Sequence, residues 1–170
     1  RHALYSSDEF ARKCGIAESP LTELAAFHII FGKTVPDISL NAVANLGYAE
    51  CSFLKPVFVG DTLRSISEVI GLKQNSNGKT GVVWVRTSGF NQRDEKVIEY
   101  IRWVMIRKRD YNSSEPTTII PKLKPCLTVK DLIIPEGLSF ENYNYELSGD
   151  KYRLNDYSIG ETINHVDGIT

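Results

Sequence analysis

The spacing of hydrophobic and polar residues predicts a short helix near the start of the chain. Residues 6–9 read Ser-Ser-Asp-Glu, a capping residue followed by acids, which is typical of a helix start. Gly15 is typical of a helix end. Phe10, Ala11 and Cys14 lie between these signals, and we expect them to face inward.

A second, more apolar helix is predicted from Ser19 to Gly32. Ser19 is a suitable N-cap, Pro20 fits the first helical position, and Gly32 is a stop signal. Apolar side chains occupy almost every position between them. We therefore expect this helix to be buried on nearly all sides.

Four β-strands are predicted after the helices, at residues 42–57, 62–74, 80–91 and 96–109. Asn77-Gly78, between the second and third strands, is a strong hairpin signal because both residues tolerate a positive φ. Tight turns between the last three strands predict an antiparallel meander. Wrapping such a sheet around the apolar helix buries both, which gives an α+β fold. Residues 110–125 are rich in proline and lack periodicity, as in a surface linker.

Composition and charge exclude several classes of protein. The 170 residues have a formal net charge of -1, with 42% hydrophobic and 24% charged residues, as in ordinary globular domains. The near-neutral balance argues against a nucleic-acid partner. We interpret the basic cluster 107–109 as solvated charge that protects a sheet margin. No apolar run approaches the roughly 20 residues that span a bilayer, so no membrane partner is expected.

The cysteines and histidines are widely scattered. The cysteines are Cys14, Cys51 and Cys126, and the histidines are His2, His28 and His165. Separated cysteines without a C-x-x-C motif predict free thiols and a reducing compartment, here the cytoplasm. The spacing contains no set of metal ligands, so no metal site is expected.

Two longer segments carry a family resemblance: residues 31–48, from Phe-Gly-Lys-Thr-Val-Pro-Asp to Gly-Tyr, and residues 53–63, Phe-Leu-Lys-Pro-Val-Phe-Val-Gly-Asp-Thr-Leu. With them, the chain resembles the MaoC-like dehydratase family. Residues 75–83 and 100–105 make it most similar to the mesaconyl-CoA hydratase (β-methylmalyl-CoA dehydratase) branch. The resemblance covers residues 4–109 and resumes at 156–161.

The resemblance implies a hot-dog fold, a long central helix wrapped by a curved antiparallel sheet, as the first repeat of a double hot-dog. Residues 1–109 would be that repeat with its first strand missing, 110–140 a linker, and 141–170 the beginning of a second repeat. Position 1 is not Met, and we expect the chain to begin inside a longer product. The implied activity is reversible addition of water to an enoyl-CoA. The CoA thioester is then a substrate, and no cofactor is expected.

The chain departs from the family at the catalytic motif. Catalytic repeats carry approximately Asp-x-Asn-Pro-Leu-His before a short helix, and residues 1–5 match this stretch here. Tyr5 occupies the His position and His2 the Asn position. A phenol with a pKa near 10 is a poor base at neutral pH. Pro20 lacks the N–H that would help to hold the thioester oxygen at the helix start. We therefore expect no catalytic residue in this chain and a catalytic His in the second repeat.

Four residues are candidates for substrate binding, and each has a structural alternative. Tyr5 would line a vestigial pocket or simply pack. His28 would contact substrate, or lie in the core bonded to a backbone carbonyl. Lys33 would meet a CoA phosphate or complement the helix dipole. Asp37 would act as an acid or cap a turn.

Two other functions compete with a hydratase half. A non-catalytic acyl-CoA-binding or scaffold module would bind thioester without turnover. A thioesterase uses the same fold but needs an activating polar group on the helix, where Glu23 in the first turn is the one acid. The partners expected for a hydratase are an acyl-CoA, a second hot-dog repeat in the same or another chain, and further copies in a homo-oligomer.

Overall fold

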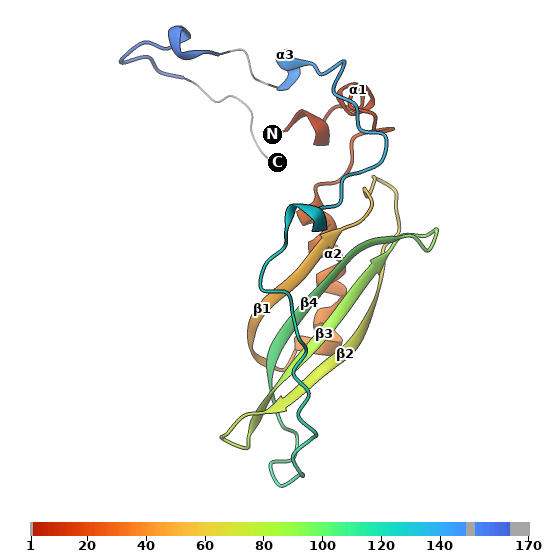
Figure 1. The fold of residues 1–170 in the computed structure, drawn as a ribbon, viewed down its shortest axis with the longest axis vertical. Coiled ribbons are helices and arrows are strands. Elements are labelled where there is room, and N and C mark those ends of the chain that lie inside the picture. The colour runs from red at the N-terminus through yellow and green to blue at the C-terminus, as the bar shows by residue number, and fades with distance from the viewer. Residues whose placement is uncertain (1, 149–151, 164–170) are drawn as a thin grey trace. The chain divides into compact units, whose positions relative to one another are not determined.

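The computed structural model describes residues 2–148 and 152–163, and the chain forms two compact units. The larger unit comprises residues 21–135, and the smaller unit comprises residues 1–20 together with 136–170 (Figure 1). No helix among the described residues is long and apolar enough to cross a membrane.

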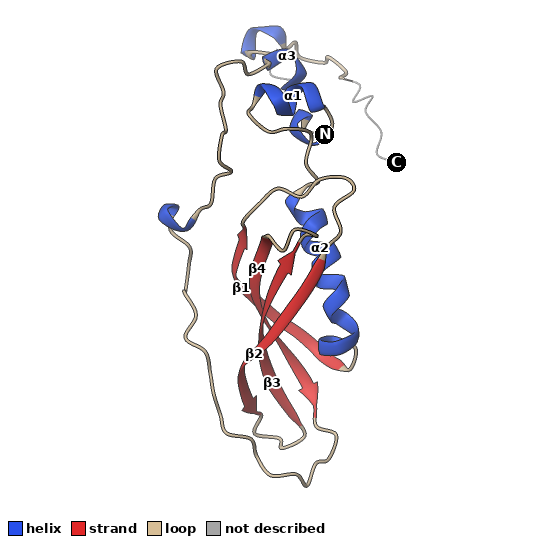
Figure 2. Ribbon diagram, turned by 90° about the vertical axis from the view of Figure 1, so that its right-hand side faces the viewer, coloured by secondary structure: helices blue, strands red, loops and turns tan. Residues whose placement is uncertain are grey.

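A four-stranded antiparallel sheet and one long helix make up most of the larger unit. Its elements are the helix α2 (Glu23–Thr34), a π-helical turn η2 (Val35–Ser39), the strands β1 (Ala42–Phe53), β2 (Arg64–Gln74), β3 (Thr80–Phe90) and β4 (Lys96–Arg107), and a 3-10 turn η3 (Val129–Asp131). The strand order is β1-β4-β3-β2, and every neighbouring pair is antiparallel. Helix α2 covers one face of the sheet, and the segment after β4 crosses the other (Figure 2).

The core lies where α2 meets the middle of the sheet. Ile30 on α2 and Ile98 on β4 are both fully buried. A Cβ added at Gly89 on β3 would lie 2.7 Å from Ile98 Cγ2 and 2.8 Å from Ile30 Cδ1. The absence of a side chain at Gly89 therefore lets the helix approach the sheet closely.

The strand and turn predictions are confirmed, with small shifts at the boundaries. Strands β2, β3 and β4 form the predicted meander, and Gly78 in the first hairpin has a φ of +65°. Strand β1 ends at Phe53 rather than at residue 57, although the Leu54 N–H still donates to the Val97 carbonyl. Pro56, which has no N–H to offer a strand partner, follows shortly afterwards.

The predicted start of the central helix is wrong. Helix α2 begins at Glu23, and the Thr22 hydroxyl caps it by accepting from the Ala25 N–H. Ser19 does not cap it, because its backbone N–H and its hydroxyl both donate to the Asp8 carboxylate. Pro20 consequently lies outside the helix and removes no donor from its first turn.

The predicted end and burial of this helix are also wrong. The chain passes Gly32 without interruption and stays helical through η2, with Pro36 in its first turn, where a missing N–H is tolerated. Only one face is buried, formed by Ala26, Ile30 and Thr34, while Leu24 is 66% exposed. The sequence is apolar all round, but the sheet of this chain covers a single side.

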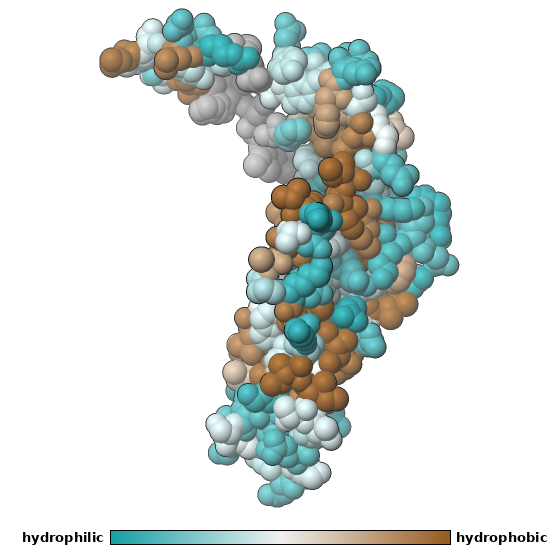
Figure 3. Space-filling model, viewed as in Figure 1, coloured by the Kyte–Doolittle hydropathy of each residue, from teal (hydrophilic) through white to brown (hydrophobic). Residues whose placement is uncertain are grey.

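A segment of the larger unit that we call the strap, residues 117–135, crosses the sheet face opposite α2. Ile119 exchanges two backbone hydrogen bonds with Leu72 at the β2 edge, and the Lys124 N–H donates to Glu50 on β1. A Cβ at Gly71 would lie 2.6 Å from Pro121 Cδ. Hydrophobic and polar side chains are interspersed along this face (Figure 3).

Within the smaller unit, the predicted first helix is confirmed. Its elements are η1 (Ala3–Tyr5), α1 (Asp8–Lys13), α3 (Tyr145–Ser148) and η4 (Leu154–Asp156). Ser7 caps α1, and the inward-facing Phe10 packs edge to face on Tyr143 at 5.2 Å between ring centroids. Gly15 ends the turn with a φ of +86° and contacts the backbone of Gly137.

Gly15→Ala is expected to loosen the packing of residues 136–148 on α1. The new methyl group would collide with the Gly137 carbonyl, and the left-handed backbone adds strain of roughly 1–2 kcal/mol. Limited proteolysis should then cut residues 136–148 several times faster. Gly60→Ala is the control, because Gly60 has a φ of +95° and open space around it. Equal cleavage of the two variants would contradict the proposed close contact.

Glu95 is expected to make stability depend on pH in the acid range. Hydrogen bonds, first from Asn91 and then from Lys55 and Arg93, lower the pKa of its carboxyl from 4.5 to about 2. A carboxyl whose pKa falls on folding stabilises the fold above its unfolded pKa, and this contribution disappears as the pH drops from about 4.5 towards 2. The Tm difference between wild type and Glu95→Gln should therefore be largest above pH 5 and shrink towards pH 2. A constant difference would argue against the interaction.

Candidate functional site

A row of hydroxyl groups crosses the inner face of the sheet beneath α2. Ser67 on β2 and the fully buried Thr87 on β3 share a hydrogen bond of 2.9 Å between their hydroxyl oxygens. Thr87 pairs in register with Tyr100 on β4, which is also fully buried. Burial raises the pKa of Tyr100, and the nearby Thr87 and Thr34 hydroxyls oppose this shift weakly without meeting the geometry of a hydrogen bond to the phenol. Tyr100 is therefore a neutral phenol that retains its proton.

Arg102, two residues further along β4, places a positive charge in this layer. The side chain has no exposed surface, and its Nη2 donates to the Thr34 hydroxyl on α2 at 2.9 Å. The guanidinium carbon lies 4.6 Å from the centre of the Phe31 ring, a cation–π distance. Desolvation lowers the pKa of Arg102, but an arginine stays charged in proteins.

A pocket of about 290 Å³ lies between the C-terminal end of α2 and strands β2 and β3, and we call it the inner pocket. Its polar lining comes from Lys33, Thr34, Asp37, Ser65 and Ser67, and its apolar lining from Ile38, Val69 and Val85. Thr34 both lines the pocket and accepts from Arg102. The Thr34 hydroxyl therefore lies between the Arg102 guanidinium and a cavity that can hold a small polar ligand.

The structure brings two of the four predicted binding residues together. Lys33 and Asp37, four residues apart on α2 and η2, both line the inner pocket. His28 does not line it: this residue is exposed on α2, with its ring 5.6 Å from the Phe27 ring. The core position expected as the alternative for His28 is therefore wrong. Tyr5 belongs to the smaller unit, half-buried in η1, with its ring 5.8 Å from the His2 ring.

Sequence reasoning missed Thr34, Tyr100 and Arg102. The signal for Tyr100 and Arg102 is the period-two pattern of β4, in which residues 98, 100, 102 and 104 face the helix and are all buried. Arg102 interrupts an otherwise apolar series at a buried position. A charged residue in the buried phase of a strand is rare and indicates a specific role.

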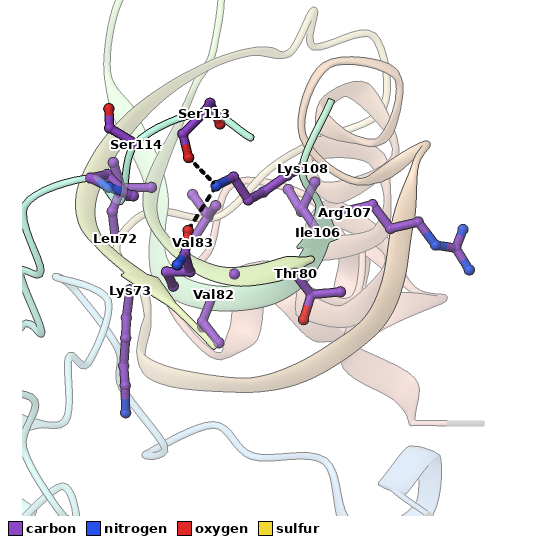
Figure 4. Close-up of a pocket in the computed structure, with 13 residues that line it drawn as sticks. Leu72, Lys73, Thr80, Val82, Val83, Ile106, Arg107, Lys108, Ser113 and Ser114 are labelled. Carbon is purple, nitrogen blue, oxygen red and sulfur yellow. Dashed lines mark hydrogen bonds between the residues drawn. The ribbon is translucent and has the colours of Figure 1, made fainter. Parts of the chain in front are cut away.

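A second pocket, of about 310 Å³, lies at the far end of the strands (Figure 4). Leu72, Val83 and Ile106 provide apolar walls, and Lys108 donates to the Gln74 side chain at 2.9 Å and the Ser113 carbonyl at 2.6 Å. Strand β4 lies inside the sheet, so the basic residues 107–109 do not protect an edge as we expected. Lys108 instead ties the segment after β4 to β2.

Metal and thiol chemistry find no support in the described part of the chain. No group of three or more His, Cys, Asp or Glu residues there could hold a metal ion. Cys14 is buried, Cys126 is exposed, and burial raises the pKa of the half-buried Cys51 thiol. A raised pKa disfavours the reactive thiolate form of Cys51.

No family model matches the chain. It is 62% identical over all 170 residues to mesaconyl-CoA hydratase from Cereibacter sphaeroides, of which it covers 50%. A crystal structure of a MaoC domain protein dehydratase from Chloroflexus aurantiacus is 55% identical over the whole chain, which covers 48% of that protein, with a TM-score of 0.84. The resemblance to the MaoC-like dehydratases is confirmed. The chain spans about half the length of the curated relatives it matches.

The fold prediction is confirmed as well. The chain also resembles a Mycobacterium tuberculosis protein described as having a double hotdog fold, with 25% identity and a TM-score of 0.59 over 66% of this chain and 36% of that protein. The antiparallel sheet around α2 is the corresponding hot-dog unit, an α+β fold.

Proposed function

We propose that the chain is the N-terminal, non-catalytic half of an acyl-CoA hydratase/dehydratase that adds water to, or removes it from, an enoyl-CoA such as mesaconyl-CoA. The observation that carries this proposal is the 62% identity to mesaconyl-CoA hydratase over every residue of the chain. The domain limits follow the same proposal: a repeat at 1–109, a linker at 110–140 and the beginning of a second repeat at 141–170. A CoA thioester is the substrate, and the reaction needs no cofactor.

The residues at the motif positions support a non-catalytic role. His2 caps η1, with its Nδ1 accepting from the Leu4 N–H at 3.2 Å. Tyr5, at the position of the catalytic His, is a phenol and a poor base. Asp8, the nearest acid, is held by Ser19, whose two hydrogen bonds lower the pKa of the Asp8 carboxyl. The base that removes the proton α to the thioester carbonyl then comes from the second repeat.

The start of α2 is not impaired by Pro20, contrary to our expectation from the sequence. Because Pro20 precedes the helix by three residues, it removes no N–H from the first turn, in which the Ala25 N–H donates to the Thr22 hydroxyl. Glu23, in this same turn, is the one acid of α2. The thioesterase alternative needs an activating polar group on the helix and therefore gains no further support.

The exposed apolar face of α2 supports a partner. Leu24 is 66% and Ile29 45% exposed, and Val43 and Tyr48 on β1 are similarly open. Several large apolar side chains left open to solvent on a helix and the neighbouring strand are typical of an interface. We propose that a second hot-dog repeat covers it, with homo-oligomerisation and a cytoplasmic location remaining predictions.

The test is hydration of mesaconyl-CoA by the complete protein that the gene encodes. The reaction is monitored as the loss of the enoyl thioester absorbance. We expect turnover with that protein and none with residues 1–170 alone. Tyr5→Phe should retain most of the activity, because the Tyr5 hydroxyl is not the base. Thioester binding without turnover by the complete protein would instead favour the acyl-CoA-binding or scaffold module.

A further inference from the structure

Two neighbouring side chains of β4 leave hydrogen-bonding groups unused inside the larger unit. The buried side-chain atoms without a hydrogen-bond partner, among the residues that the structure describes, are the Tyr100 hydroxyl and the Nε and Nη1 of Arg102. All three carry a proton that they can donate. Buried polar atoms in folded proteins almost always have a partner, so this layer is short of acceptors.

The missing acceptor should be negatively charged. Arg102 donates to the hydroxyl and, at 3.5 Å, to the carbonyl of Thr34, and its guanidinium lies over the Phe31 ring. These partners are neutral, and Arg102 forms no ion pair with a carboxylate among the residues that the structure describes. Burying a guanidinium without a counter-ion destabilises the folded state. A carboxylate would accept from the guanidinium and from the phenol at once, in the charge-assisted geometry that arginine favours.

The route to this site leads through the inner pocket. Thr34 separates Arg102 from the pocket, and Val85, which lines the pocket, pairs in register with Arg102. Lys33 and Asp37 in the lining have opposite charges and offset each other. Arg102 is therefore the group that would select a ligand by its charge.

We propose that Arg102 and Tyr100 bind the free carboxylate of a dicarboxylic acyl thioester. This inference rests on the proposed function and names its specificity-determining site. Mesaconyl-CoA carries such a carboxylate at the end of its acyl chain. The buried charge would then be balanced only when the substrate is present, and thioesters of monocarboxylic acids would leave it unpaired.

The binding test uses two saturated four-carbon thioesters that cannot be hydrated, succinyl-CoA and butyryl-CoA, with the complete protein in calorimetric titrations. Wild type should bind succinyl-CoA more tightly than butyryl-CoA. Arg102→Met should weaken succinyl-CoA binding by roughly 30-fold or more, with butyryl-CoA unchanged. Tyr100→Phe should weaken succinyl-CoA binding by several-fold. Arg86→Met is the matched control, because Arg86 is a half-exposed arginine on the adjacent strand that pairs with Glu68.

Arg102→Lys is a second variant for the case in which Arg102→Met does not fold. It keeps the charge but loses the planar guanidinium, so its affinity for succinyl-CoA should lie between those of wild type and Arg102→Met. Equal preference of wild type for the two thioesters, or equal losses for both in Arg102→Met, would overturn the proposal. Hydration of mesaconyl-CoA by wild type separates this result from failure of the proposed function. Turnover without carboxylate selection would leave the hydratase standing and refute only the role of Arg102.

Discussion

Ile30→Ala is expected to lower the free energy of unfolding by about 2–5 kcal/mol. The Ile30 side chain is fully buried between α2 and the sheet and contacts the space that Gly89 leaves open. The substitution removes apolar contacts and leaves a cavity, because the rigid strands β3 and β4 cannot collapse into it. Urea denaturation should show a lower midpoint with an unchanged slope.

Ile134→Ala provides the matched control for this prediction. It deletes the same atoms from the strap, where the Ile134 side chain is 72% exposed, and should change stability by less than about 0.5 kcal/mol. A loss at Ile134 as large as that at Ile30 would mean that the strap, rather than the face beneath α2, holds the core.

The strands were predictable from sequence because their signals are local. Alternating apolar residues and the Asn77-Gly78 turn determine the meander whatever else the chain does. The helix boundary was not predictable in the same way. Ser19 is a good cap by residue type, but Asp8, eleven residues earlier, takes both of its donors. Such competition depends on tertiary structure, which local propensity does not contain.

The site residues also differ in how far the sequence predicts them. Lys33 and Asp37 lie in a segment that resembles a known family, and the structure places both at the inner pocket. Arg102 also lies in a segment of that resemblance. Because the strand around it is mostly apolar, this one charged residue was not singled out from the sequence. What makes Arg102 notable is its pairing with Thr34, 68 residues away along the chain. Sequence spacing gives no indication of that contact.

Thr34→Val is expected to destabilise the protein by about 2–3 kcal/mol, the scale for a hydrogen bond to a buried charged group. The Thr34 hydroxyl accepts from Arg102 and donates to the Phe31 carbonyl at 2.7 Å. Valine has the same shape but can do neither, so the guanidinium would lose its one hydroxyl acceptor. Thr34→Ser keeps both hydrogen bonds and should cost about 1 kcal/mol or less, for one lost methyl group.

The double variant Thr34→Val/Arg102→Met separates the charge from the packing. Replacing a buried, poorly paired charge with an apolar side chain of similar length is often neutral or stabilising, so Arg102→Met alone should change stability by no more than about 1 kcal/mol. Without the charge, the missing acceptor matters less. The double variant should therefore be more stable than Thr34→Val alone, with a coupling energy of about 1–2 kcal/mol from thermal and urea denaturation. Strictly additive losses would show that Thr34 acts through packing and not through Arg102. Recovery in the double variant would show that Thr34 stabilises the protein by accepting from the buried Arg102 guanidinium.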